Sequence, residues 1–564
     1  MSFYGFMMKV MSLVGKTVMG KLEKTTQDPM AVQEQMLLSI LKQNQDTQFG
    51  KENGFAKIHS IADYQARMKI REYDEFAPYI ERMVKGEENV LSAEHIGHFN
   101  KTSGTLGCAK YIPLEKKQIG ICGKYHALFA NGLIASQIGY GWNDGKGVNL
   151  QEGSAEVLPS GATYGCASSV AVKGGPFKDL SSSIYTSPIE ARQPAPGVVT
   201  RYIHARFALA ERHVTYVVAT FSSIILEMFR YIEDHHEMLV RDIEQGTIDE
   251  SVDLPDEVRA SLLSRIKPDP KRAEELRAAF AQGFDRPWAK RIWPELQYIY
   301  SAAGANFSPY TEKLRKHILG EDVPVFYMGV SASEGLFSVP WGKDDPDSIL
   351  APDGCFMEFR DADDEAAPCL TMDRLEKGKC YELIITNYSG LYRYRMHDVV
   401  RVTGFHNRTP LIQFETRAGF AANIRGEKTS ESAVRSMIEE TEKALGIEVT
   451  DYSLYADTDA TPPGYVVLLE LRHRPADVSD AQIEACLKEK LMEANHDIIE
   501  DFEGGHLADP KLVLLQPETF LLYRDVMIHR GTAAAQLKPV HVIRNEFQRR
   551  FFFALQEDRE PAAE

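Results

Sequence analysis

The stretch T-S-G-T-L-G-C-A-K at Thr102–Lys110 guides the interpretation of the whole sequence. Its glycines let backbone N–H groups approach phosphate oxygens, its hydroxyl side chains add donors, and its closing lysine supplies a positive charge. The order of a P-loop, G-x-x-x-x-G-K-[S/T], is missing. A Ser/Thr/Gly cluster is also typical of a surface turn, so the prediction of a phosphate loop depends on the motifs that follow it.

The composition is that of a globular chain. The 564 residues are 44% hydrophobic and 26% charged, and this length predicts about two to four domains. Acidic residues outnumber basic ones by 81 to 64, a net charge of −17, which argues against nucleic acid or an anionic membrane as the main partner. The seven cysteines are odd in number and lack C-x-x-C or zinc spacing, so we expect a reducing, cytoplasmic setting.

The sequence predicts no signal peptide and no integral membrane segment. Met1–Lys21 mixes apolar residues with lysines, a pattern that predicts either a helix packed on the protein or a helix on a membrane surface. The uncharged stretch Val214–Leu226 is too short to span a bilayer. We predict that it forms a buried helix.

Helical patterns precede Asn100, and short apolar runs typical of strands appear later in the chain. The expected strands are Leu296–Tyr300, Val323–Tyr327, Phe356–Phe359, Tyr381–Thr386, Val399–Thr403 and Leu411–Phe414. These patterns predict an α/β (α+β) fold with a large N-terminal domain of mixed β-sheets and helices, residues 1–424. A smaller, mobile α/β C-terminal domain, residues 425–564, is expected to follow the polar, glycine-bearing hinge Arg425–Ser430.

Two helices are predicted in the C-terminal domain. One carries Val434–Leu445 and ends at Gly446. The other opens with a capping box formed by Ser479 and Gln482. Apolar residues at Leu512–Leu515 and Thr519–Tyr523 predict further strands.

Tyr327–Gly335 is predicted to be a strand that runs into a turn of small residues ending in a carboxylate. The small residues leave room for a flat ring, and Glu334 offers the oxygen ligand that Mg²⁺ prefers beside triphosphate oxygens. The alternative is an ordinary strand-end turn with a solvated glutamate.

The run T-N-Y-S-G-L-Y-R-Y-R-M-H-D at Thr386–Asp398 predicts a strand with its tyrosines, Tyr392 and Tyr394, on one face and its arginines on the other. Asp398 is expected at the strand end, where a carboxylate accepts hydrogen bonds from ribose hydroxyls. The same alternation is typical of a half-exposed strand with no ligand.

Two further segments carry candidate contacts. Phe414–Arg417 precedes the expected hinge, and Lys428 lies within it, so a second ribose or phosphate contact is expected where two domains meet. Gly531–Lys538 is a loop of small residues that ends in a lysine. Each segment alone is also consistent with a surface turn.

Taken in order, these motifs resemble those of the adenylate-forming enzymes, and the chain is similar to the auxin-responsive Gretchen Hagen family of acyl acid–amido synthetases, as a bacterial-type member. The resemblance extends from about Met30 to the C-terminus. Its most specific parts are the T-S-G-T loop, the S-A-S-E-G turn and Tyr388–Phe405. His397 stands where the family usually has glycine, and Leu106 and Cys108 replace smaller or polar residues.

The resemblance implies that ATP and Mg²⁺ activate a small-molecule carboxylic acid to an acyl-adenylate, which an amine, usually an amino acid, then attacks. It implies Glu334 as the metal ligand and Lys538 as the catalytic lysine that bridges carboxylate and α-phosphate. The implied nucleotide-binding residues are Thr102, Ser103, Gly104, Thr105, Tyr327, Ser333, Asp398, Phe414, Arg417 and Lys428.

Two other functions stay open from the sequence. The same adenylation with coenzyme A or a carrier thiol as acceptor would give a thioester instead of an amide. A nucleotide-binding protein without catalysis is the second alternative.

Overall fold

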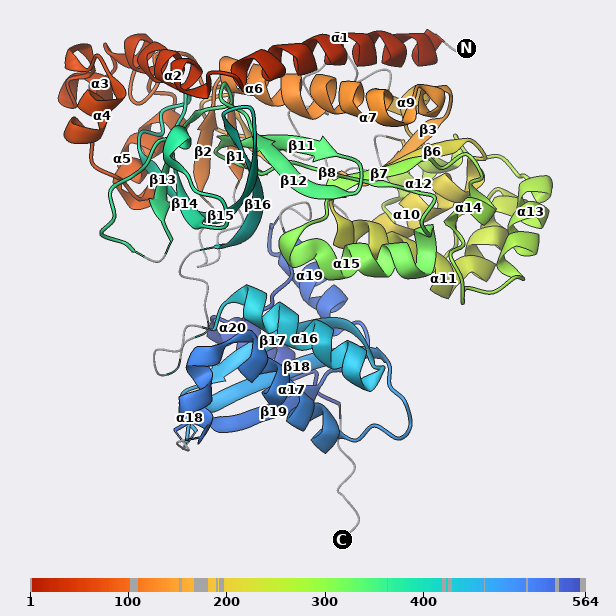
Figure 1. Ribbon diagram of the computed structural model, residues 1–564. Coiled ribbons are helices and arrows are strands. Elements are labelled where there is room, and N and C mark those ends of the chain that lie inside the picture. Colours follow the sequence, from red (N-terminus) through yellow and green to blue (C-terminus); the bar gives the residue numbers. More distant parts are fainter. Residues whose placement is uncertain are drawn as a thin grey trace. The chain divides into compact units, whose positions relative to one another are not determined.

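The computed structural model describes residues 3–101, 110–151, 155–166, 181–188, 191, 197–362, 364–417, 422, 424, 429–460, 462–503, 506–532 and 537–557. The described residues form two compact units that divide between Glu415 and Thr416. Figure 1 shows the elements of each unit: the first extends from α1 to β16, and the second from α16 to α20.

The N-terminal helix α1 (Phe3–Thr25) packs along a second long helix. That helix begins as α6 (Lys116–Gly123), passes through a π-helical segment at Lys124–Phe129 and continues as α7 (Ala130–Ile138). Gly15 permits the close approach, because a Cβ there would lie 2.1 Å from the carbonyl oxygen of Leu128. The N-terminal segment therefore packs against this second helix, beside α6 and α7 in Figure 1.

The described residues of the first unit form three larger sheets and one hairpin. The parallel sheet has the order β3 (Lys146–Asn149), β6 (Val214–Phe221), β7 (Tyr298–Ala302), β8 (Val325–Tyr327). The six-stranded sheet has the order β11 (Ser338–Gly342), β12 (Asp345–Leu350), β16 (Thr409–Arg417), β15 (Tyr394–His406), β14 (Cys380–Thr386), β13 (Phe356–Asp361). The third sheet has the order β2 (Tyr111–Leu114), β1 (His98–Lys101), β5 (Thr163–Gly165), β4 (Ala155–Val157). The hairpin pairs β9 (Ser331–Ala332) with β10 (Gly335–Leu336).

The prediction of a buried helix at Val214–Leu226 is wrong for its first eight residues. Val214–Phe221 forms β6, and helix α11 begins only at Ser222. The segment is rich in β-branched and aromatic residues and pairs in parallel with a strand on each side. A strand buried in a parallel sheet is apolar along its whole length, so periodicity alone did not distinguish it from a helix.

The remaining helices of the first unit surround these sheets. Those before the first strand are α2 (Pro29–Asn44), α3 (Gln48–Glu52), α4 (Ile61–Arg67) and α5 (Tyr73–Val84). Those after β5 are α9 (Ser181–Ile184), α10 (Gly197–Ala210), α11 (Ser222–Gln245), α12 (Asp256–Leu263), α13 (Pro270–Phe280), α14 (Ala289–Ile292) and α15 (Ser308–Lys313).

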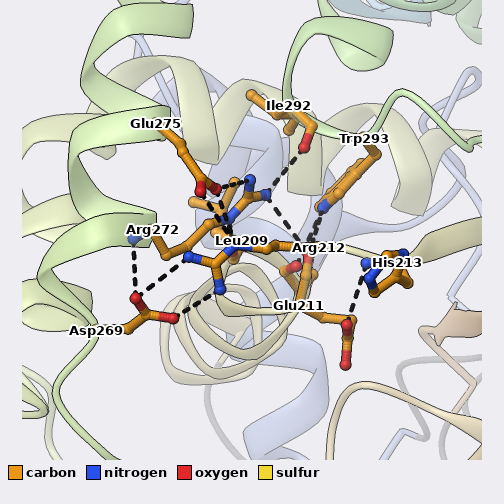
Figure 2. A network of polar contacts seen from close by, with 10 residues as sticks. Leu209, Glu211, Arg212, His213, Asp269, Arg272, Glu275, Ile292 and Trp293 are labelled. Carbon is orange, nitrogen blue, oxygen red and sulfur yellow. Dashed lines mark hydrogen bonds and ion pairs between the residues drawn. The ribbon is translucent and has the colours of Figure 1, made fainter.

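A polar network closes the C-terminal end of α10 (Figure 2). The buried Arg272 guanidinium donates to the carbonyl of Leu209 at 2.8 Å and to that of Ile292 at 2.9 Å. The Trp293 indole donates to the carbonyl of Ala208 at 3.2 Å. The last carbonyls of a helix lack partners within it, so these donors satisfy buried oxygens and join α10, α13 and the α14 segment.

The second unit has a three-stranded sheet with the order β17 (Glu448–Asp457), β18 (Gly464–His473), β19 (Ala508–Leu514). Its helices are α16 (Glu431–Leu445), α17 (Asp480–Ala494), α18 (Ile499–Glu503), α19 (Thr519–His529) and α20 (Glu546–Phe553). The predicted helices are confirmed: Gly446 ends α16 in the left-handed conformation, and Ser479 and Gln482 form a capping box on α17. The mixed architecture confirms the predicted α+β fold class.

The predicted strand at Thr519–Tyr523 is wrong, because these residues begin α19. The Glu470 carboxylate accepts the backbone N–H groups of Glu518 at 3.0 Å and Phe520 at 3.1 Å. A carboxylate at this position satisfies N–H groups that a helix start leaves unpaired. The contact comes from β18, so the local sequence did not reveal it.

Among the helices that the structure describes, none is both long and apolar enough to cross a membrane.

Candidate functional site

Several of the predicted site residues lie outside the described residues. These are Thr102, Ser103, Gly104, Thr105 and Lys428, together with the side chain of Arg417. Two lysines that border the predicted phosphate loop are described. The Lys101 ammonium lies 5.5 Å from the ring centroid of Tyr164, and the Lys110 ammonium lies 4.8 Å from that of Tyr73. Both ends of the loop therefore carry a positive charge.

Ser333 and Glu334 form the two-residue loop of the β9–β10 hairpin, because Ala332 pairs with Gly335. Although Glu334 stands at this tip, only 5% of it is exposed. The approach to the hairpin is tight: a Cβ on Gly329 would lie 2.2 Å from the carbonyl oxygen of Ser338. The alternative of a solvated glutamate in an ordinary turn is therefore wrong.

Two buried amide side chains hold the carbonyl groups of this loop. Asn100 Nδ2 donates to the carbonyl oxygen of Ser333 at 2.6 Å, and Asn387 Nδ2 donates to that of Glu334 at 2.8 Å. Asn100 lies on β1, two residues before Thr102, and Asn387 follows the end of β14. Three motifs that are distant in sequence therefore meet at the Ser333–Glu334 loop. Neither asparagine was predicted as a site residue, although Asn387 lies within the motif at Thr386–Asp398 and Asn100 lies two residues before the T-S-G-T loop.

The loop from Asn387 to Leu391 is organised by the same amide. Asn387 Oδ1 accepts the backbone N–H groups of Ser389 at 3.0 Å and Leu391 at 3.1 Å. The Ser389 hydroxyl in turn accepts the backbone N–H of Glu115 at 3.1 Å. These bonds link the loop to the start of α6, the helix that follows β2.

Glu115 is a buried carboxylate at the N-terminal end of α6. Burial raises its pKa, and nearby Lys117 partly offsets this effect. A carboxyl group whose pKa is raised by folding stabilises the protein below its unfolded pKa, and this contribution is lost as the pH rises through the folded pKa.

We therefore expect Glu115→Gln to raise the free energy of unfolding at pH 8 by about 1 kcal/mol, because it removes a charge that burial disfavours. At pH 4, where the wild-type carboxyl is largely protonated, the two proteins should have equal stability. Urea unfolding followed by circular dichroism at both pH values measures the difference. An equal change at pH 4 and pH 8 would contradict the assignment.

Asp398 is buried in β15, but the structure corrects its predicted place at the strand end. The strand continues from Tyr394 to His406, and Asp398 lies in its first half at an irregularity where the β14–β15 register shifts. The preceding residue His397 has a φ of 61°. His397 thus adopts the left-handed conformation that glycine would allow. The backbone turn is therefore the same although histidine stands where the resemblance leads us to expect glycine. Its imidazole Nε2 lies 2.8 Å from Glu72.

The left-handed backbone conformation of His397 leads to a prediction about backbone strain. We expect His397→Gly to change the free energy of unfolding by less than about 1 kcal/mol, because relief of strain offsets the loss of a partly exposed ion pair. His397→Val should cost about 1–3 kcal/mol, because a β-branched residue is strained at positive φ. Thermal and urea unfolding of both variants test this. Equal stability of the two would show that the turn has another conformation.

The predicted alternation of tyrosines and arginines is wrong. Tyr392, Arg393 and Tyr394 are all buried, and Arg393 has a φ of 48° just before β15 begins. Arg393 forms a two-pronged ion pair with buried Glu358 at 3.0 and 2.9 Å. Arg395 pairs with Glu382 at 2.7 Å. These arginines hold the sheet together.

The other predicted residues are spread over both units. Tyr327 ends β8 and is half-buried, with its pKa raised mainly by burial. Phe414 is half-buried on β16. Lys538 is exposed and belongs to the second unit.

The described residues contain no group of three or more His, Cys, Asp or Glu side chains able to hold a metal ion. Mg²⁺, however, is commonly held by one or two carboxylates together with the phosphates of a bound nucleotide. The single buried carboxylate of Glu334 fits that arrangement. The donor set therefore suits a metal ion that arrives with a nucleotide.

Three family models match the chain in order: the GH3 family N-terminal domain over residues 18–325, the central domain over residues 348–417 and the C-terminal domain over residues 432–546. The chain is 28% identical to indole-3-acetic acid-amido synthetase GH3.8 of Oryza sativa subsp. indica, over 92% of this chain and 89% of that protein. It is 25% identical to jasmonoyl–L-amino acid synthetase JAR4 of Nicotiana attenuata, over 92% of each chain.

The fold also matches a solved structure. The GH3.15 acyl acid amido synthetase superposes with a TM-score of 0.85 at 22% sequence identity, over 96% of this chain and 97% of that one. The two proteins therefore share their fold.

Proposed function

Since the chain belongs to the GH3 family, we propose that it is an ATP-dependent acyl acid–amido synthetase. Relatives named as amido or amino acid synthetases match about nine-tenths of this chain, and this observation carries the proposal. Its substrates are a small-molecule carboxylic acid, ATP and an amine, which we propose to be an amino acid. Seven scattered cysteines support a cytoplasmic location.

The reaction has two steps. A carboxylate oxygen of the acid attacks the α-phosphorus of ATP, and the bond to pyrophosphate breaks. The amine nitrogen then attacks the acyl carbon, AMP leaves, and the nitrogen loses a proton as the amide forms. The acid and ATP repel each other, so catalysis consists largely of positioning and charge neutralisation.

We propose these roles for the residues of this chain. Thr102, Ser103, Gly104 and Thr105 hold the phosphates between the charges of Lys101 and Lys110. Glu334 and the phosphates hold Mg²⁺, which neutralises charge at the site. The nucleotide contacts comprise Tyr327, Ser333, Asp398, Phe414, Arg417 and Lys428. Lys538 bridges the acid and the α-phosphate.

We also propose that residues 1–424 and 425–564 are separate domains. The two half-reactions need different surroundings, one that expels pyrophosphate and one that admits an amine. A change in the position of the smaller domain would supply both.

A screen of carboxylic acids against amino acids, with mass spectrometry for AMP and a new amide, tests the proposal. AMP whose formation requires the amino acid is the expected result. AMP that forms only with coenzyme A or another thiol would identify a thioester-forming ligase. Absence of ATP–pyrophosphate exchange with every acid would leave a nucleotide-binding protein without catalysis.

A further inference from the structure

We propose that Asn100 and Asn387 are positioning residues that fix the Ser333–Glu334 loop, and thereby the Glu334 carboxylate, for a nucleotide-bound Mg²⁺. The inference rests on the proposed function and goes beyond it. Neither asparagine is expected to touch the nucleotide. Each acts through the backbone of the hairpin loop.

The geometry of the two contacts supports this role. In a two-residue hairpin loop, carbonyl groups at the tip usually reach water. Here successive carbonyls, of Ser333 and Glu334, are bound at 2.6 and 2.8 Å by side chains from two other segments. Only 2% of Asn100 and none of Asn387 is exposed. The carbonyl of Ser333 and that of Glu334 belong to the two peptide planes that flank the Glu334 Cα atom. Bonds to both restrict the backbone rotation of Glu334, and with it the direction of its Cα–Cβ bond.

The orientation of the Asn387 amide follows from its other contacts. Its Oδ1 accepts two backbone N–H groups, those of Ser389 and Leu391, so its Nδ2 must face the carbonyl of Glu334. The amide cannot be flipped without losing all three bonds. A change from amide to carboxylate at this position keeps the acceptor oxygen, replaces the donor that holds the Glu334 carbonyl by a second acceptor oxygen, and adds a charge that the Gln33→Glu control also introduces.

The two contacts also bring together the segments that the proposed function requires at one site. Asn100 is two residues from the predicted phosphate loop, and Asn387 opens the loop that leads into the strand of Asp398. A displacement of about 1 Å in a catalytic constellation can cost about 10²-fold in rate. The amides that hold the Ser333–Glu334 loop against these two segments are therefore expected to affect the binding of both the metal ion and the nucleotide.

The chain offers a matched control in Gln33. Its amide is also fully buried, donates to the carbonyls of Pro352 at 2.5 Å and Cys355 at 2.8 Å, and accepts the N–H of Met357 at 2.8 Å. It thus holds a loop with as many bonds as Asn387 does, but it binds neither Ser333 nor Glu334. Gln33→Glu makes the same change from amide to acid in a side chain that holds a loop outside the candidate site.

The test is the binding of ATP, measured by isothermal titration calorimetry in MgCl₂ and in EDTA, which needs no knowledge of the acid. The measured quantity is the ratio of the ATP Kd in EDTA to that in MgCl₂. We expect this ratio to fall at least tenfold or to reach unity in Asn387→Asp and Asn100→Asp, as in Glu334→Gln. The Kd in EDTA should change less than threefold. Gln33→Glu should lower stability and leave the ratio unchanged.

The outcomes separate the two proposals. A wild-type protein that binds no ATP overturns the proposed function and this inference with it. Binding that Mg²⁺ strengthens in the wild type and equally in the folded asparagine variants overturns the inference alone. Folding is checked by circular dichroism. If neither asparagine variant folds while Gln33→Glu does, the amides serve the whole unit, and the positioning role is rejected.

Discussion

Replacement of Lys538 by alanine is expected to lower the rate of ATP–pyrophosphate exchange by about 10²–10³-fold, the usual cost of removing one donor that stabilises charge in a transition state. The reason is electrostatic. When the acid carboxylate approaches the α-phosphorus, negative charge accumulates on both, and a lysine between them stabilises the transition state more than the separate reactants. ATP binding should weaken less than fivefold, because most contacts to the nucleotide remain. Radiolabelled pyrophosphate exchange and calorimetric ATP binding measure the two quantities.

Two further variants serve as controls for the Lys538→Ala experiment. Lys538→Arg keeps a positive charge and should retain part of the lost exchange rate, whereas Lys511→Ala removes an exposed lysine from β19 of the same unit and should leave it unchanged. A Lys538→Ala enzyme with wild-type exchange would rule out the assigned role. A variant that loses exchange and ATP binding to the same extent would place the lysine in nucleotide binding instead.

The sequence predicted local structure best where a few neighbouring residues determine it. Helix α16 was predicted from its apolar face and the glycine at Gly446, and α17 from the capping box of Ser479 and Gln482. These signals act within a few residues of the helix ends. By contrast, the strand at Val214–Phe221 and the helix at Thr519–His529 depend on partners elsewhere in the chain.

In the candidate site, too, residues marked by their sequence neighbours were predicted, and residues that depend on distant contacts were not. Glu334 was identified because it ends a turn of small residues, and the structure places it at a hairpin tip. Asn100 and Asn387 were missed because an uncharged amide gives no pattern, and its contacts with Ser333 and Glu334 span more than fifty residues. The local signals were the adjacency of Asn100 to the T-S-G-T loop and the position of Asn387 within the motif at Thr386–Asp398.

Charged residues were the least predictable. A sequence gives the spacing of Arg393 but neither its left-handed backbone nor its partner, Glu358, 35 residues away. The sequence predicted only that Arg393 and Arg395 share one face of a strand. The structure pairs them with carboxylates of the sheet.

Arg393→Met is expected to lower the free energy of unfolding by about 3–5 kcal/mol, the usual cost of leaving one member of a buried ion pair without its partner. Glu358 is almost fully buried and receives both prongs of the guanidinium. Arg393 Nη1 also donates to the carbonyl of Met68 at 2.6 Å, so the variant leaves that oxygen with one donor fewer. Urea unfolding followed by circular dichroism measures the loss.

A second pair, formed by Arg401 of β15 and Glu415 of β16, provides the comparison that isolates burial. Arg401 and Glu415 form an equally close two-pronged pair, at 3.0 and 2.7 Å, but 42% of the Arg401 side chain is exposed. The Glu415 carboxylate is 24% exposed and stays accessible to water when it loses its partner, so Arg401→Met should cost no more than about 1 kcal/mol. The double variant with Glu358→Leu and Arg393→Met should recover part of the stability lost by Arg393→Met alone, because it removes the unpaired charge. Equal losses for Arg393→Met and Arg401→Met would show that contact geometry, and not burial of the charges, determines the energy of these pairs.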